Sequence, residues 1–234
     1  GTTTFTGALA TTAAAGIEVD GTNFDFNSTI TSTLGDLDID ASGTVRFNGA
    51  VAMNDAANGL VTVSNAGLLT ITAAGDMSIN GIFSQDGAGA VSTAGDITTT
   101  NDNINFLRAV TLTGAVALDS GAGAGTITFQ STLDGNQTLG LTAGTGAIDF
   151  DGIVGGTTPL GAVTITSAGN VTADAAFSAA SLRQVAGTGT TTFTGALATT
   201  AAAGIEVDGT NFDFNSTITS TLGDLDIDAS GTVR

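Results

Sequence analysis

GTTTFTGALATTAAAGIEVDGTNFDFNSTITSTLGDLDIDASGTVR fills residues 1–46, and the same stretch returns unchanged at residues 189–234, so that Gly189 repeats Gly1. Self-similarity at a fixed period is typical of repeat architectures. We therefore expect residues 1–188 to be one full tandem unit and residues 189–234 to be the start of the next, in one continuous structure taken from a longer protein. An array of identical units builds length, but it does not gather many different groups around one reacting atom.

A shorter pattern runs through the unit. A phenylalanine recurs with an apolar residue or threonine two positions before it, a small residue two positions after it and an aliphatic residue four positions after it. Examples are Thr3-Phe5-Gly7-Leu9, Val45-Phe47-Gly49-Val51, Ile127-Phe129-Ser131-Leu133 and Ile148-Phe150-Gly152-Val154. The spacing is mostly 20 to 23 residues, with longer steps between Phe47 and Phe106. Alternation with a period of two predicts strands, and the small residue predicts a bend.

A second strand is predicted 8 to 12 residues after the motif, for example at 17–19, 37–39, 139–141 and 163–165. No window has a helical period with helix formers and caps. Short strands that recur every ~21 residues with like residues in register predict an all-β, parallel β-solenoid, or β-helix. We expect about 21 residues per coil and eight or nine coils in the unit 1–188. Phe5, Phe26 and Phe47 would then form an internal ladder, with coils ~4.8 Å apart.

The composition excludes several classes of function. There are 22 acidic residues against 4 arginines, a net charge of −18, which disfavours nucleic acid and anionic membranes as partners. The chain has no cysteine for disulfides or thiolate metal sites, and no histidine or lysine for general-base work near neutral pH. No apolar run reaches the ~18 to 20 residues of a membrane helix. We therefore expect no enzyme, no catalytic residues and no membrane insertion.

Three stretches, TITFQSTLDG (126–135), LGLTAGTGAIDFDGIVGG (139–156) and GAVTITSAGNVTADAAF (161–177), resemble the repeats of giant bacterial surface proteins of the filamentous-haemagglutinin-like and autotransporter-passenger type. The likeness extends over essentially the whole chain. It implies a right-handed parallel β-helix, secretion to the cell surface, and a role in adhesion, biofilm or sheath formation. The resemblance implies no set of functional residues.

One cluster of carboxylates is a candidate metal site. If Val19 stacks on Ile39, then Glu18 and Asp20 lie beside Asp38 and Asp40, with Asp36 close by; the cluster recurs at Glu206, Asp208, Asp224, Asp226 and Asp228. A calcium ion, which takes six to eight oxygen ligands, would relieve the repulsion among these charges. The alternative is a solvated acidic face, and the calcium-binding nonapeptide with its Gly-Gly-x-Gly-x-Asp pattern is absent.

The outward positions beside the phenylalanines would form one column: Thr4, Asp25, Arg46, Asn105, Thr128 and Asp149. Asp25 and Arg46 would face each other as a cross-strand pair worth roughly 0.2–1 kcal/mol. Arg108, at a position that is usually glycine or serine, should turn outward at a bend. Threonine runs suggest an ice-binding array, but Asp, Asn and Arg interrupt the columns.

These features predict a structural repeat of a giant secreted protein: a stiff rod in an extracellular filament, a sheath or an adhesin stalk. Its expected partners are copies of itself, end to end, because uncapped coil ends are open sheet edges. Lateral association of rods into filaments is a further option. The alternative function is a calcium-dependent adhesive module that recognises glycans. No cofactor other than calcium is expected.

Overall fold

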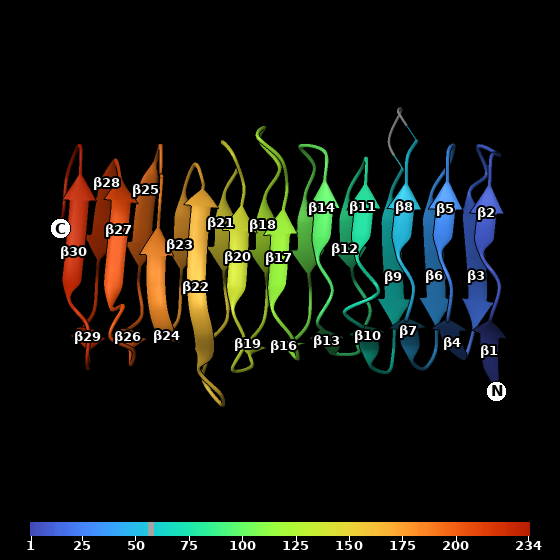
Figure 1. The fold of residues 1–234 in the computed structure, drawn as a ribbon, viewed down its shortest axis with the longest axis horizontal. Coiled ribbons are helices and arrows are strands. Elements are labelled where there is room, and N and C mark those ends of the chain that lie inside the picture. Colours follow the sequence, from blue (N-terminus) through green and yellow to red (C-terminus); the bar gives the residue numbers. More distant parts are fainter. Residues whose placement is uncertain (56–58) are drawn as a thin grey trace.

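The computed structural model describes residues 1–55 and 59–234, and it confirms that the chain is an all-β parallel β-solenoid. The described residues form about 11 turns of about 21 residues each. They contain no helix, and so none long enough to cross a membrane. Figure 1 shows the strands stacked along one axis, with the two ends of the chain at opposite ends of the rod. Each turn passes through three strand positions, which we name the first, second and third face in chain order.

The first face begins with the N-terminal strand and continues to the middle of the rod. It contains β1 (Thr2–Phe5), β4 (Asn23–Phe26), β7 (Val45–Phe47), β10 (Leu69–Ile71), β13 (Val91–Thr93), β16 (Val110–Leu112) and β19 (Leu133–Asp134). Isolated bridges from Leu133 to Val154 and from Val154 to Phe177 carry it onward. It ends with the beginning of β24 (Phe177–Gln184), then β26 (Leu197–Thr199) and β29 (Ile218–Ser220).

The second face extends along the whole rod. It contains β2 (Leu9–Thr11), β5 (Ile30–Ser32), β8 (Val51–Met53), β11 (Met77–Ile79), β14 (Ile97–Thr99), β17 (Val116–Asp119), β20 (Leu139–Thr142) and β22 (Leu160–Ser167). The end of β24 follows, because this long strand turns the corner from the first face to the second. The face ends with β27 (Ile205–Gly209) and β30 (Leu225–Ala229).

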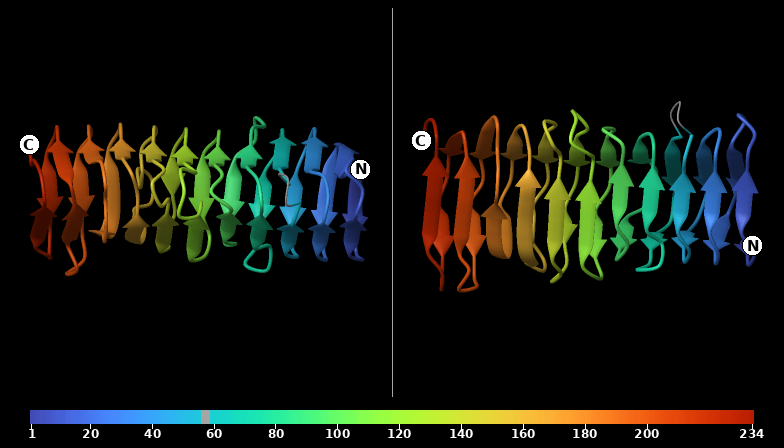
Figure 2. Two further views of the ribbon diagram at one scale, coloured as in Figure 1. Left: turned by 90° about the horizontal axis from the view of Figure 1, so that it is seen from above. Right: turned by 45° about the horizontal axis from the view of Figure 1, so that its top comes forward.

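The third face completes each turn. It contains β3 (Ile17–Gly21), β6 (Leu37–Ala41), β9 (Val61–Asn65), β12 (Phe83–Gln85), β15 (Ile104–Phe106), β18 (Ile127–Phe129), β21 (Ile148–Phe150), β23 (Val171–Ala173), β25 (Thr190–Phe193) and β28 (Asn211–Phe214). Every strand pairing on the three faces is parallel, and the rows of strands are visible from two further directions in Figure 2.

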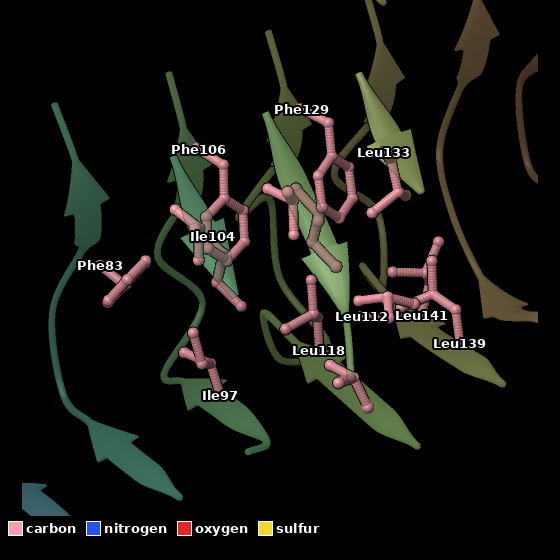
Figure 3. Close-up of a cluster of buried hydrophobic side chains, with 14 of the residues drawn as sticks. Phe83, Ile97, Ile104, Phe106, Leu112, Leu118, Phe129, Leu133, Leu139 and Leu141 are labelled. Atoms are coloured by element: carbon pink, nitrogen blue, oxygen red, sulfur yellow. The ribbon is translucent and has the colours of Figure 1, made fainter. Parts of the chain in front are cut away.

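Alternation of side chains along each strand builds the core. In β7, for example, Val45 and Phe47 are fully buried and Arg46 between them is exposed. The same inward column of aliphatic and aromatic residues recurs in each turn, so one apolar core runs through the rod. Figure 3 shows Phe106 and Phe129 from β15 and β18, with Ile97 and Leu118 of the second face in the same cluster. No buried polar side-chain atom lacks a hydrogen-bond partner among the described residues.

The predicted phenylalanine ladder is confirmed. Phe5, Phe26 and Phe47 stack on the first face with ring centroids 5.1 and 5.2 Å apart. Further along the chain the ladder lies on the third face, where Phe129 stacks on Phe106 and on Phe150 at 5.4 and 5.5 Å. The ladder therefore changes face after Phe47, whose neighbour on the next turn is Ile71.

This change of face makes the predicted single outward column wrong. Thr4, Asp25 and Arg46 pair in succession on the first face, and Thr70 follows them there. Asn105, Thr128 and Asp149 pair in succession on the third face. Between β7 and β15 the chain makes two full turns and then passes two further faces, so the step from Phe47 to Phe106 is two and two-thirds turns. The motif of strand, bend and strand is local, so it does not reveal this change of face.

The small residue of the motif lies at a bend, as predicted: Gly49 is at the corner between the first and second faces, where an added Cβ would lie 2.4 Å from the Ser28 backbone. The next corner of the turn also contains glycines. Gly16 and Gly35 stack at the corner between the second and third faces, and both have positive φ, 71° and 84°. A Cβ on Gly35 would lie 2.5 Å from the Gly16 nitrogen. Glycine is required at this corner both for the backbone conformation and for the close approach of neighbouring turns.

Candidate functional site

The acidic cluster lies where the register predicted it. Glu18 pairs with Asp38 and Asp20 with Asp40 on adjacent strands β3 and β6 of the third face, and all four side chains are exposed. The cluster ends after two turns, because Thr62 and Ser64 of β9 take the next positions. We call Glu18, Asp20, Asp38 and Asp40 the acidic ladder.

The surroundings of Asp38 raise the pKa of this member of the ladder. Desolvation against the neighbouring strands raises the pKa of the Asp38 carboxyl, and like charges raise it further, in the order Asp40, Asp86, Asp20 and Asp36. Directly opposed like charges on neighbouring strands destabilise a sheet. Repulsion among the ladder carboxylates therefore destabilises the folded chain, and a bound cation or protonation would reduce this repulsion.

Asp36 has a structural contact instead of a place in the ladder. Its Oδ1 accepts a hydrogen bond of 2.9 Å from the backbone N–H of Leu60, one turn further along the rod. In the same corner, Asp55 Oδ2 accepts a hydrogen bond of 2.8 Å from Gly35 N. These carboxylates fasten one turn to the next at the corner between the second and third faces.

The described residues contain no group of three or more acidic side chains whose geometry fits a metal ion. The ladder carboxylates stand in two rows along an exposed face and do not converge on a common point. A groove of about 420 Å³ lies beside Asp40 at the corner leading to the first face, and its other lining residues are small or neutral. Calcium binding by the ladder stays a prediction.

The second copy of the cluster has a different neighbour. Glu206 pairs with Asp226 and Asp208 with Asp228, but on the second face instead of the third. On the preceding turn, Arg183 of β24 pairs with Glu206, and Arg183 Nε lies 3.3 Å from Glu206 Oε1. Both side chains are about half exposed, so this ion pair is worth at most about 1 kcal/mol. The second copy of the cluster therefore has a cation beside it on the preceding turn, whereas the acidic ladder lies at the start of the described chain, before Arg183.

The predicted pair of Asp25 and Arg46 has the expected register, but Arg46 Nε donates to Asn48 Oδ1 at 2.8 Å. In the second copy, Arg234 Nη2 lies 3.8 Å from Asp213 Oδ2. Arg108 is exposed at a bend, as predicted, and its backbone N–H donates to Gln85 Oε1.

Sequence reasoning missed a second acidic group on the third face. Burial raises the pKa of the half-buried Asp149, the charge of Asp151 raises it further and that of Asp174 adds a smaller effect, while a hydrogen bond from Thr172 lowers it. Asp174 lies one turn beyond the other two acids, and only the stacking of turns brings it close to them.

It also missed the recurrent corner amides. Asn23, Asn103, Asn170 and Asn211 each accept, through Oδ1, a backbone N–H of the next turn at 2.8 to 3.0 Å. An Asn before an apolar strand, repeated at the coil period, is the pattern that would have revealed them.

The chain matches no known family model, no curated protein and no solved structure. The arrangement of its own residues is therefore the basis for a functional proposal.

Proposed function

We propose that this chain is a structural repeat of a giant secreted protein, which forms an extracellular filament, a sheath or the stalk of an adhesin. The observation that supports the proposal is the tandem copy itself. Residues 189–234 continue the same stack of strands that residues 1–46 begin, without a break in the core or in the parallel pairing. A unit that continues into its own copy in this way can extend a rod copy by copy.

The mechanical basis lies in the contacts between turns. Each turn gives its backbone hydrogen bonds to the turns on either side, as in Asn27 N to Phe5 O and Asn48 N to Phe26 O, at 2.9 and 2.8 Å. Apolar side chains of successive turns also stack along the axis of the rod. Stability then adds turn by turn, and a longer array is more stable than a single unit.

The identical copies show what a neighbouring turn contributes. Leu37 is fully buried between two turns, whereas its counterpart Leu225 in the last turn is 47% exposed. At the other end, Phe5, Leu9, Ile17 and Val19 are only partly buried, whereas Phe193, Leu197, Ile205 and Val207 are at most 2% exposed. The two ends are apolar and have unpaired strand edges, which favours association end to end with further copies.

The remaining features of the proposal follow from sequence and charge. The resemblance to giant bacterial surface proteins implies a right-handed winding and an extracellular location. The lack of His, Cys and Lys supports a role without catalysis. The net charge of −18 keeps such a rod apart from nucleic acid and anionic lipid.

Electron microscopy of chains with one, two and four units tests the proposal. Rods that lengthen by about 40 Å for each tandem unit, with a ~4.8 Å layer spacing, support it. Compact beads joined by linkers, or a length that does not grow in proportion to the number of units, would refute it.

A second candidate is a calcium-dependent adhesive surface, favoured by the opposed carboxylates of Glu18 with Asp38 and Asp20 with Asp40. Isothermal titration with calcium tests this function. Binding heat and a raised melting temperature, both lost when Glu18→Gln and Asp38→Asn are combined with Glu206→Gln and Asp226→Asn in the second copy, support it. If the titration produces no heat, the cluster is a solvated acidic face that does not bind calcium.

A further inference from the structure

The two identical copies lie on different faces of the rod. In the first copy, β1 and β4 lie on the first face, but their counterparts β25 and β28 lie on the third. Likewise β3 and β6 lie on the third face, and their counterparts β27 and β30 lie on the second. Every strand of the second copy is displaced by one face in the same direction.

The displacement follows from the number of turns in one unit. β1 is the first strand of the first face, and β25 is the ninth strand of the third face. Eight full turns and two further faces separate them, so one tandem unit makes eight and two-thirds turns. The unit is not a whole number of turns, and each new copy begins two-thirds of a turn further around the axis. On a rod with three faces, this is the same orientation as a rotation backward by one face, or one-third of a turn.

The fold accepts this displacement without local change. Gly16 N donates to Ala13 O at 3.0 Å, and in the second copy Gly204 N donates to Ala201 O at 3.0 Å. Thr44 N donates to Asn23 Oδ1 at 2.8 Å, and Thr232 N donates to Asn211 Oδ1 at 3.0 Å. The same residues therefore form the same strands and corners on whichever face they fall. Each strand of the repeated stretch is thus found on two of the three faces.

We infer that a tandem array of this unit is a threefold screw, in which each unit docks on a second copy of itself rotated by one face. One unit rises about 42 Å along the axis, and the original orientation returns after three units, or 26 turns, at about 125 Å. The docking surface is the turn that contains Val171–Ala173 and Phe177–Gln184, and its partner is the turn that begins at Thr190.

The screw determines how an array presents its charges. The acidic ladder lies on the third face in one unit and on the second in the next, so no face carries it in two consecutive units. In an array, each Glu18 also lies opposite the Arg183 of the preceding unit, as Glu206 does here at 3.3 Å. A partner that recognises the ladder would meet it in three directions around the rod. Lateral contacts to neighbouring rods would be spaced in the same way.

Paired cysteines in the chain of 234 residues test the displacement directly, because the chain has no cysteine of its own. Thr172 and Thr192 are paired neighbours on the third face. If the second copy kept the orientation of the first, Thr192 would instead follow Ser178 on the first face. Adjacent turns place Cα atoms ~4.8 Å apart, within the range that a disulfide spans.

We expect Thr172→Cys with Thr192→Cys to form a disulfide on mild oxidation, to the extent of the control Ser92→Cys with Thr111→Cys, a neighbouring pair on the first face. Ser178→Cys with Thr192→Cys should stay reduced. The reverse result, or no disulfide in the test pair when the control pair forms one, overturns the inference. Peptide mapping of the oxidised chains identifies each bond.

The extension to many units rests on the proposed function as a continuous rod, and cryo-electron microscopy of a chain of three units separates the two. A rise of ~42 Å with a rotation of one-third of a turn per unit supports the screw. A continuous rod without rotation overturns the screw and leaves the proposed function standing. Separate beads refute the rod, while the cysteine pairs still report the orientation of the second copy.

Discussion

The ring of Phe214 stacks on that of Phe193 at a centroid distance of 5.8 Å, just as Phe26 stacks on Phe5 at 5.1 Å, although the first pair lies on the third face and the second pair on the first. The four residues belong to the same repeated stretch. The same residues thus stack on one another on two different faces of the rod. This duplication provides matched controls within one molecule.

The two copies predict how much a covering turn contributes to stability. Phe193→Ala removes a ring that is 2% exposed and contacts phenylalanines on both sides, so it should lower the free energy of unfolding by about 3–5 kcal/mol. Phe5→Ala removes the identical, partly buried ring from the end turn and should cost clearly less. Urea denaturation with local hydrogen exchange measures both; equal losses would contradict additive stacking of turns.

Substitution in a buried pair of amide side chains should lower the stability more than substitution of an outward side chain on the same strand. Gln85 Nε2 donates to Asn65 Oδ1 at 2.8 Å and to the carbonyl oxygens of Gly87 and Gly89, inside the rod. Gln85→Ala leaves these acceptors without that donor and should cost about 2–4 kcal/mol. Ser84→Ala, on the outward side of the same strand, should change stability by less than about 0.5 kcal/mol. Thermal and urea unfolding of the two variants check the difference.

The acidic ladder predicts a pH dependence. Because the pKa of Asp38 is raised in the folded state, folding takes up a proton there, and this contribution to stability is lost as pH rises from below 3.8 through the raised value. Asp38→Asn should therefore stabilise the chain at neutral pH, by about 0.2–1 kcal/mol, the range of one exposed cross-strand pair.

The gain from Asp38→Asn should vanish when the pH falls below 3.8, where the wild-type carboxyl is itself protonated. Part of the gain should also be lost in high salt, which screens the neighbouring carboxylates. Urea unfolding from acid to neutral pH at two salt concentrations gives the measurement. A gain that is independent of pH would show that like-charge crowding is not its cause.

The corner amides should contribute through one acceptor atom. Asn103 Oδ1 accepts the backbone N–H of Thr126 at 2.9 Å, so Asn103→Ala should lower stability by about 1 kcal/mol. Asn103→Asp keeps the acceptor and should retain most of that stability. Hydrogen exchange at Thr126 reports the bond itself, and unchanged protection in the alanine variant would exclude this role.

Much of the candidate site was visible in the sequence because its register follows from the coil period. Stacking Val19 on Ile39 is enough to place Glu18 beside Asp38 and Asp20 beside Asp40, and the structure has these pairs. The hydrogen bond from Leu60 N to Asp36 was not predictable, because the donor is 24 residues away and its position depends on the path of the corner. The contact of Arg183 with Glu206 likewise requires knowing which face each copy occupies.

The sequence by itself determined the kind of structure: short alternating strands, bends at small residues, parallel turns of about 21 residues and a phenylalanine ladder through Phe5, Phe26 and Phe47. These features depend on side-chain period and spacing, which are local. Only the tertiary structure decided the face on which each strand lies. The residues of the repeated stretch form the same corners in two positions around the rod, so local sequence does not fix the face. The face depends on the length of every turn before it, and the change of face between Phe47 and Phe106 affects all later strands.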